Sequence, residues 1–242
     1  MAEVPVLEKK RVGRIGLIDA ARGLSVLVMI VYHLCYDLYQ YGYISRGQMF
    51  SPFANFIQVF FASLFILLSG ISCRFSKSNL KRGIWIFAAG MAVSAVTYFY
   101  SPNLVVRFGI LHFLGVAAVF YGLVQKALDK LLPSFVAPLV YLVGAIATWS
   151  IPHNTYSVKW LWMFGFCDAS FRSSDYFPIL PNIFIYLFGT WLGAYIASGR
   201  FPKWFYHLRI KPLEWIGRRT IWIYLIHQPV CVGIVWAISK MF

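Results

Sequence analysis

Apolar residues occur in runs of about 20 along the whole chain, and charged residues or prolines separate the runs. A helix of about 20 apolar residues is long enough to cross the hydrocarbon core of a bilayer. The pattern predicts about seven spans, near residues 18–40, 53–73, 84–100, 109–125, 135–150, 179–197 and 220–238. Because the connections are short, we expect residues 1–242 to form a single all-α transmembrane bundle.

The composition agrees with this fold class. Of the 242 residues, 60% are hydrophobic and 12% are charged, whereas a soluble domain is about half apolar and roughly a quarter charged. The cysteines are scattered, without a CxxC pair, at Cys35, Cys73, Cys167 and Cys231. We interpret them as small hydrophobic residues and expect no metal site.

The net charge of +14 would indicate nucleic acid as a partner of a soluble protein, but the positions of the basic residues give another explanation. Of the 22 lysines and arginines, 17 fall on one side of the predicted topology and five on the other. The positive-inside rule then places the N-terminus in the cytoplasm and the C-terminus outside. The basicity indicates topology and no nucleic-acid partner, although it would also suit an anionic cytoplasmic coenzyme.

Two cytoplasmic segments outside the spans are expected to be basic. Residues 1–14 form a basic tail, and residues 198–219 alternate aromatic and cationic side chains, as in a segment that lies on the inner leaflet. In the sixth span, Gly189 and Gly193 form a GxxxG motif, which lets another helix approach closely. That helix could belong to a second copy of the chain, as in a homo-oligomer, or to the same bundle.

The first span carries four polar residues: Asp19, Arg22, His33 and Asp37. A charge at the centre of a spanning helix costs about 2.5–3.5 kcal/mol, so such residues usually face a cavity or a partner. Arg22 and His33 lie within about 20° of one helix face, with a rise of roughly 16 Å between them. Asp37 follows His33 by one turn, where its carboxylate could orient the imidazole.

This polar stripe fits a ligand with an anionic end at Arg22 and a reactive end at His33. Acetyl-CoA, or another acyl-CoA, has this shape, and its phosphates would meet Arg22 with Arg14 and Asp19 beside it. The pantetheine arm would then lie along the stripe. The alternative interpretation is an Asp19–Arg22 ion pair and a structural histidine.

Two further histidines lie in other spans. His112 begins the fourth span close behind Arg107, and we expect it to meet His33 at a similar depth. His227 lies about two turns into the last span. We expect it closer to the cytoplasm, where it lines or braces the path without transferring protons.

The outer segment, residues 151–178, is rich in aromatic residues. Its Trp160 and Trp162, with Arg107 nearby, are the candidate acceptor-binding residues, because aromatic faces can stack on a sugar or a lipid. An aromatic belt at the membrane interface is the alternative.

Four segments of the chain resemble a known family. They are the R-x10-H pattern from Arg22 to His33 within LIDAARGLSVLVMIVYH, then RFGILHFLG, FPILPNIFIYLFGTWLG and LEWIGRRTIWIYLIHQPV. From about residue 14 to 235 the chain resembles bacterial members of the heparan-alpha-glucosaminide N-acetyltransferase catalytic-domain family. The first and last segments are also similar to the acyltransferase type 3 family.

The resemblance implies that cytoplasmic acyl-CoA donates its acyl group through the bundle to an outer acceptor, often a sugar amine or hydroxyl. It matches Arg22 and His33 to the R-x10-H motif. The eukaryotic enzymes use a histidine in the outer segment after this motif, whereas here no histidine occurs between His33 and His112. We therefore do not expect heparan sulfate itself to be the substrate.

Together these features predict an integral membrane acyltransferase of the bacterial plasma membrane, which contacts membrane lipid and a small-molecule or glycan acceptor. His33, supported by Asp37 and His112, would act as general base on the acceptor, with an acyl-histidine intermediate as the variant. A transporter or flippase of a small anionic or lipid-linked solute would use the same stripe without chemistry. A structural subunit whose polar residues only fix packing is the third class.

Overall fold

The computed structural model describes residues 13–241, and within that range the secondary structure is helical, with two isolated β-bridges. The all-α prediction is confirmed. Six helices are long and apolar enough to cross a membrane. They are α1 (Gly16–Gln40), α3 (Pro52–Cys73), α4 (Asn79–Tyr100), α5 (Ile110–Leu131), α7 (Ile179–Ala197) and α10 (Thr220–Met241).

The expected span at 135–150 corresponds to α6 (Ala137–Thr148), which has 12 residues and packs along α7. At 1.5 Å per residue it is about 18 Å long, shorter than a bilayer core. Six long helices and α6 are consistent with about seven spans. The remaining elements are short: α2 (Arg46–Met49), α8 (Lys203–His207), α9 (Lys211–Arg218), η1 (Pro102–Leu104), η2 (Ile151–His153) and η3 (Trp162–Phe164).

Local sequence sets where several helices begin. Ser51 precedes α3, and its hydroxyl accepts a hydrogen bond from the Ala54 N–H (3.2 Å), while Pro52 takes the first helical position. Ser78 caps α4 in the same way through the Lys81 N–H (3.3 Å). Such side chains satisfy the free N–H groups of a first helical turn.

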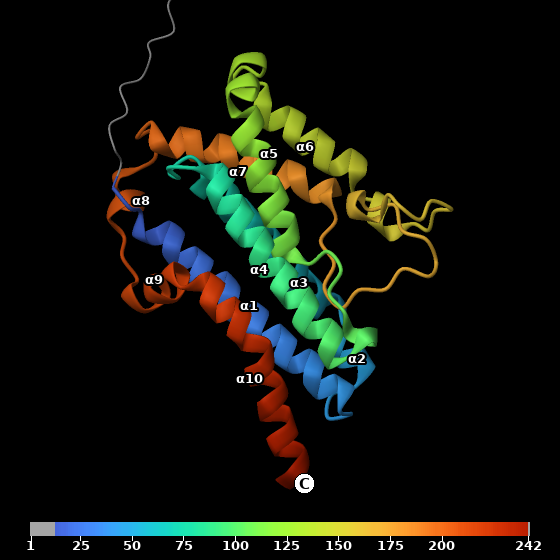
Figure 1. Ribbon diagram of the computed structural model, residues 1–242. Coiled ribbons are helices and arrows are strands. Elements are labelled where there is room, and N and C mark those ends of the chain that lie inside the picture. The colour runs from blue at the N-terminus through green and yellow to red at the C-terminus, as the bar shows by residue number, and fades with distance from the viewer. Residues whose placement is uncertain (1–12, 242) are drawn as a thin grey trace, which may run out of the picture.

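The helices run between two ends of the bundle (Figure 1). One end, called the basic end below, holds the N-terminus of α1, the α3–α4 connection, the C-terminus of α5, and helices α8 and α9. There Arg74 pairs with Asp129 (2.6 Å) and joins the α3–α4 connection to α5. The opposite end holds α2, residues 101–109 and the outer segment.

This arrangement gathers the described members of the 17 predicted inner basic residues at the basic end. Residues 1–12 of the predicted basic tail lie outside the described residues.

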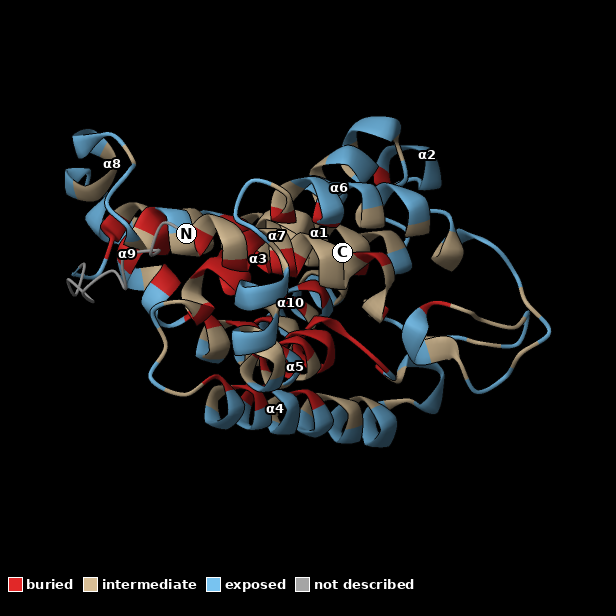
Figure 2. Ribbon diagram, turned by 90° about the horizontal axis from the view of Figure 1, so that it is seen from above, coloured by how far each residue is buried: buried red, intermediate tan, exposed pale blue. Residues whose placement is uncertain are grey.

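The core lies between α3, α5 and α7. Its largest fully buried side chains include Ile66, Phe113, Tyr121 and Tyr186. Figure 2 shows that buried residues follow α5, whereas most of α4 is exposed on its outer face. Helix α5 is therefore central, and α4 presents apolar residues outward, as expected for a helix in contact with lipid.

Glycines permit two close helix crossings. A Cβ on Gly189 or Gly193 of α7 would meet the backbone of α3, so the GxxxG motif serves packing inside this chain. Gly23 of α1 and Gly217 of α9 face each other in the same manner. The second crossing seats α9 directly against α1.

The position of α9 differs from the prediction that residues 198–219 lie on the membrane surface. Helix α8 is exposed, but α9 packs along the first turns of α1 and buries Glu214, which is 2% exposed. Two contacts hold α9 there: Gly217 packs closely against Gly23 of α1, and Arg218 reaches the Asp19 carboxylate (3.7 Å). As a consequence α10 begins partway along α1.

We expect Gly217→Ala to destabilise the protein by about 1–3 kcal/mol, because its Cβ would meet the backbone carbonyl of Asp19 and push α9 off α1. Thermal unfolding in detergent measures the loss. The matched control is Gly233→Ala in α10, where a Cβ would meet nothing within 4 Å. Equal unfolding midpoints for the two variants would contradict this close crossing.

Candidate functional site

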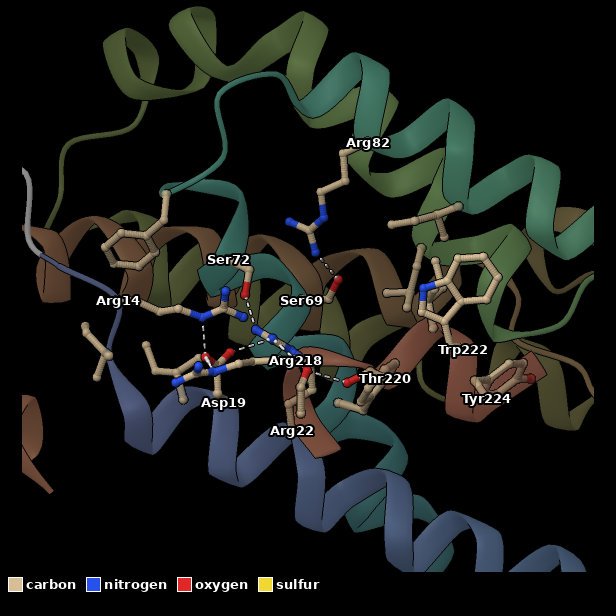
Figure 3. A pocket seen from close by; sticks show the side chains of 18 of the residues that line it. Arg14, Asp19, Arg22, Ser69, Ser72, Arg82, Arg218, Thr220, Trp222 and Tyr224 are labelled. Atoms are coloured by element: carbon tan, nitrogen blue, oxygen red, sulfur yellow. Dashed lines mark hydrogen bonds and ion pairs between the residues drawn. The ribbon is translucent and has the colours of Figure 1, made fainter. Parts of the chain in front are cut away.

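A cavity of about 680 Å³ lies between α1, α3, α4, α5 and α10, next to α9 (Figure 3). Its wall at the basic end carries four arginines and one carboxylate: Arg14, Arg22, Arg82, Arg218 and Asp19. Farther along the bundle the wall is apolar and ends at Tyr224 of α10. The cavity therefore joins a cationic mouth to an apolar interior.

Asp19 is the anionic centre of the mouth and is only 4% exposed. Its carboxylate pairs with Arg14 (2.5 Å) and Arg22 (3.0 Å), and Arg218 lies 3.7 Å away. Arg22 also donates a hydrogen bond to Ser72 Oγ on α3 (2.5 Å). The predicted group of Arg14, Asp19 and Arg22 is thus brought together on one cavity wall.

Arg82 of α4 faces this group from the other side (Figure 3). It donates a hydrogen bond to Ser69 Oγ (3.1 Å), and no carboxylate of the described residues lies within ion-pair distance of it. One carboxylate against four arginines leaves an excess of positive charge, and such a mouth attracts anions. Sequence analysis treated Arg82 as one of many topological cations, because nothing in its local pattern sets it apart.

Glu214 holds Arg218 in place at the mouth. It accepts two hydrogen bonds from Arg209 (2.7 and 2.6 Å) and one from Arg218 (3.0 Å). These bonds from Arg209 hold the pKa of the Glu214 carboxyl below its usual range. Arg218 lies between the Glu214 and Asp19 carboxylates and so connects α9 to α1.

A second polar group lies farther along the bundle, where His33 of α1 contacts His227 of α10. The centroids of their rings are 5.0 Å apart. The expectation that His227 lies closer to the cytoplasm than His33 is wrong, because α10 begins partway along α1 once α9 has packed there. His227 also contacts the ring of Tyr224 at 5.1 Å, next to the cavity.

Asp37 and His112 take partners other than His33. Both oxygens of Asp37 accept hydrogen bonds from Gln228 Nε2 on α10 (3.1 and 3.0 Å). His112 Nε2 lies 3.1 Å from Ser94 Oγ, and its ring packs against Phe108. The expected contact between the two histidines of α1 and α5 is replaced by the contact of His33 with His227.

Asp175 of the outer segment is a polar residue that sequence analysis missed. Its Oδ2 accepts hydrogen bonds from the Ile110 N–H at the start of α5 (3.0 Å) and from the Tyr224 hydroxyl (3.2 Å). Burial raises the pKa of its carboxyl, and these hydrogen bonds oppose the rise. An aspartate in a long connection carries no local signal that it will enter the bundle.

The outer segment is fastened beside the start of α5. Phe177 N–H donates to the Phe108 carbonyl (2.8 Å), and Arg107 N–H donates to Ser173 Oγ (3.0 Å). Trp162 packs between Phe108 and Phe171, whereas Trp160 is 74% exposed. The guanidinium of Arg107 lies over the Phe171 ring at 5.9 Å. Trp162 and Arg107 therefore share one aromatic cluster.

The described residues contain no group of three or more His, Cys, Asp or Glu side chains that could hold a metal ion.

Five of the six long apolar helices line a cationic cavity, and the six together define an integral membrane protein. The model of the family described as heparan-alpha-glucosaminide N-acetyltransferase, catalytic, matches residues 14–229. The chain belongs to this family, as the four segments predicted, and membership indicates a membrane acetyltransferase. No curated protein and no solved structure matches the chain.

We expect Glu214 to contribute to stability in a pH-dependent way. Because its pKa is lowered in the folded protein, its contribution is present above the ordinary value of 4.5 and is lost as the pH falls through the folded value. The difference in unfolding midpoint between the wild type and Glu214→Gln should therefore be largest near neutral pH and shrink toward about pH 3. Thermal unfolding of both proteins across this range measures it, and a constant difference would contradict the ion pairing.

Proposed function

We propose that the chain binds acetyl-CoA, or another acyl-CoA, in the arginine-lined cavity and transfers the acyl group to an amine or hydroxyl of a sugar acceptor. The observation that carries the proposal is the cavity itself. It joins four arginines at the basic end to an apolar path that ends at Tyr224, next to the histidines. Membership of an acetyltransferase family agrees with this use.

The mouth of the cavity suits the nucleotide end of coenzyme A. Guanidinium groups bind phosphate through paired, charge-assisted hydrogen bonds. Arg22 and Arg218 already share Asp19, whereas Arg82 pairs with a hydroxyl and is free to take a phosphate. The volume of about 680 Å³ lies in the range of about 300–1,000 Å³ that is typical of ligand sites.

The apolar part of the cavity suits the pantetheine arm. It leads past Leu111 and Leu114 to Tyr224, whose ring contacts His227, and His227 contacts His33. An arm that follows this path brings the thioester toward the two histidines. The acceptor would approach from the opposite end, where Trp160, Trp162 and Arg107 are its candidate binding residues.

His33 is assigned as the general base of the transfer. It takes a proton from the acceptor nitrogen or oxygen as that atom forms a bond to the thioester carbonyl carbon. The carbon–sulfur bond breaks, and the coenzyme thiolate receives a proton. Asp37 and His112 bond Gln228 and Ser94 instead of His33, so the proposed step does not use them as direct partners of His33. An acyl-histidine intermediate remains the variant path.

By the positive-inside rule, the distribution of basic residues supports a donor site on the cytoplasmic face and an acceptor on the outer face of the membrane, which we infer to be a bacterial plasma membrane. A transporter would use the same cavity without consuming the thioester. Release of free coenzyme thiol therefore separates the two functions.

Arg82→Ala should weaken binding of acetyl-CoA by roughly 10- to 100-fold, because one charge-assisted hydrogen bond contributes about 1.5–3 kcal/mol. Isothermal titration into the detergent-purified protein measures the change. Arg46→Ala, in the exposed helix α2 at the opposite end, is the control and should bind as the wild type does. Unchanged affinity in Arg82→Ala would exclude phosphate binding at this wall.

His33→Ala should reduce release of coenzyme thiol from acetyl-CoA by about 10²- to 10⁴-fold, the usual contribution of a general base. Its affinity for free coenzyme A should stay near that of the wild type, because His33 lies away from the arginines. A thiol-reactive dye measures turnover with glucosamine as the probe acceptor. Full activity in this variant would refute the catalytic role of His33.

A further inference from the structure

Beside His33, three polar groups have no role in the transfer described so far: His227, Tyr224 and Asp175. They come from α10 and from the outer segment, and each contacts another of the three. Their position between the end of the cavity and His33 raises the question of how the proton taken from the acceptor reaches the sulfur of the coenzyme.

The hydrogen bonds of His227 define which of its nitrogens carries hydrogen. Its Nδ1 lies 2.5 Å from the Tyr224 carbonyl oxygen, which can only accept, so Nδ1 carries the hydrogen. Nε2 then carries no hydrogen and has a free lone pair. It is buried and has no hydrogen-bond partner among the described residues.

A buried polar atom without a partner costs about 1–3 kcal/mol. Such atoms are rare in native proteins and usually have a specific structural or functional cause. Here the free nitrogen belongs to a ring whose centroid is 5.0 Å from that of His33. A basic nitrogen kept unpaired next to the proposed general base is placed to receive a proton.

Asp175 supplies the negative charge for that proton. Its carboxylate accepts a hydrogen bond from the Tyr224 hydroxyl (3.2 Å), and the ring of Tyr224 contacts His227. The other carboxylate of this region, Asp37, is held by Gln228. A fixed carboxylate stabilises an imidazolium that forms nearby, as the aspartate of a Ser-His-Asp triad does.

We propose that His227 is a second proton-transfer residue, which carries the acceptor's proton from His33 to the leaving thiolate of coenzyme A, with Asp175 as its positioning residue. The proton leaves the acceptor for His33, passes to Nε2 of His227 and then protonates the sulfur. Both histidines end neutral, and the products are the acylated acceptor and the free thiol. This inference rests on the proposed function.

The direction of the relay follows from the contacts. His227 touches Tyr224, which lines the cavity that the thioester would enter. His33 contacts the same ring, with 5.0 Å between the centroids. In the proposed relay His227 therefore takes the proton from His33 and gives it to a thioester that lies beside Tyr224.

The test uses His227→Asn in the full chain. The asparagine amide can still donate to the Tyr224 carbonyl but offers no basic nitrogen. We expect single-turnover transfer from acetyl-CoA to glucosamine to slow by about 10²- to 10⁴-fold, while the Kd for coenzyme A changes less than about threefold. The solvent deuterium isotope effect on transfer should also change, which a bracing role would not cause.

His207→Asn is the matched control. His207 on α8 also bonds a backbone carbonyl through Nδ1 (2.7 Å, to Lys203) but is exposed and far from the centre. It should transfer at the wild-type rate. Transfer within threefold of the wild type in His227→Asn, or an unchanged isotope effect, would overturn the inference.

Asp175→Asn is the second variant, in case His227→Asn does not fold. Its amide oxygen can still accept from the Ile110 N–H, so the start of α5 is kept and only the charge is lost. We expect transfer to slow by at least tenfold with unchanged coenzyme affinity, and a wild-type rate would overturn the role of Asp175. If the wild type binds acetyl-CoA but releases no thiol with glucosamine or water, the proposed function fails and this inference with it.

Discussion

The ion pairing of Asp19 is the constraint on which the site depends. A carboxylate buried in a membrane helix requires cationic partners, and Asp19 draws them from its own helix and from α9. This pairing, together with the glycine crossing, fixes α9 against α1. Because α10 follows α9 directly, the same contact determines how far along α1 the last helix begins. The ion pairing of Asp19 therefore also determines, through α9 and α10, that His227 contacts His33.

The excess of positive charge at the mouth of the cavity is unfavourable without a ligand, and it therefore favours the binding of an anion. Three of the four arginines share Asp19, and Glu214 pairs with Arg218 alone among them, so the like charges of the four repel one another and a bound polyanion would relieve that repulsion. Their place at the basic end, next to the membrane surface, keeps part of this charge solvated, as the half-exposed Arg218 shows. On the proposed function, the phosphates of the coenzyme neutralise the excess positive charge of these arginines.

The features that sequence predicted are local ones. Hydrophobic runs located the long helices, and the helical period placed Arg22 and His33 on one stripe, because both depend on neighbours along one helix. Arg82, Arg218 and Asp175 could not be assigned, since each acts through a residue from another element. Depth and helical spacing predicted that Asp37 and His112 contact His33. In the fold both residues bond nearer partners from other helices. Helix α6 is shorter than its apolar run because turns take up the first and the last residues of that run, at 134–136 and 149–150.

Asp175 links the two halves of the site. It belongs to the outer segment that also carries Trp162, yet its carboxylate bonds the tyrosine that closes the donor cavity. It also accepts a hydrogen bond from the first turn of α5, the most buried of the six long helices. On the proposed function, an acceptor that shifts the outer segment would change the hydrogen bond to Tyr224. On the two proposals together, Asp175 would therefore connect the acceptor side of the site to the cavity that takes the donor.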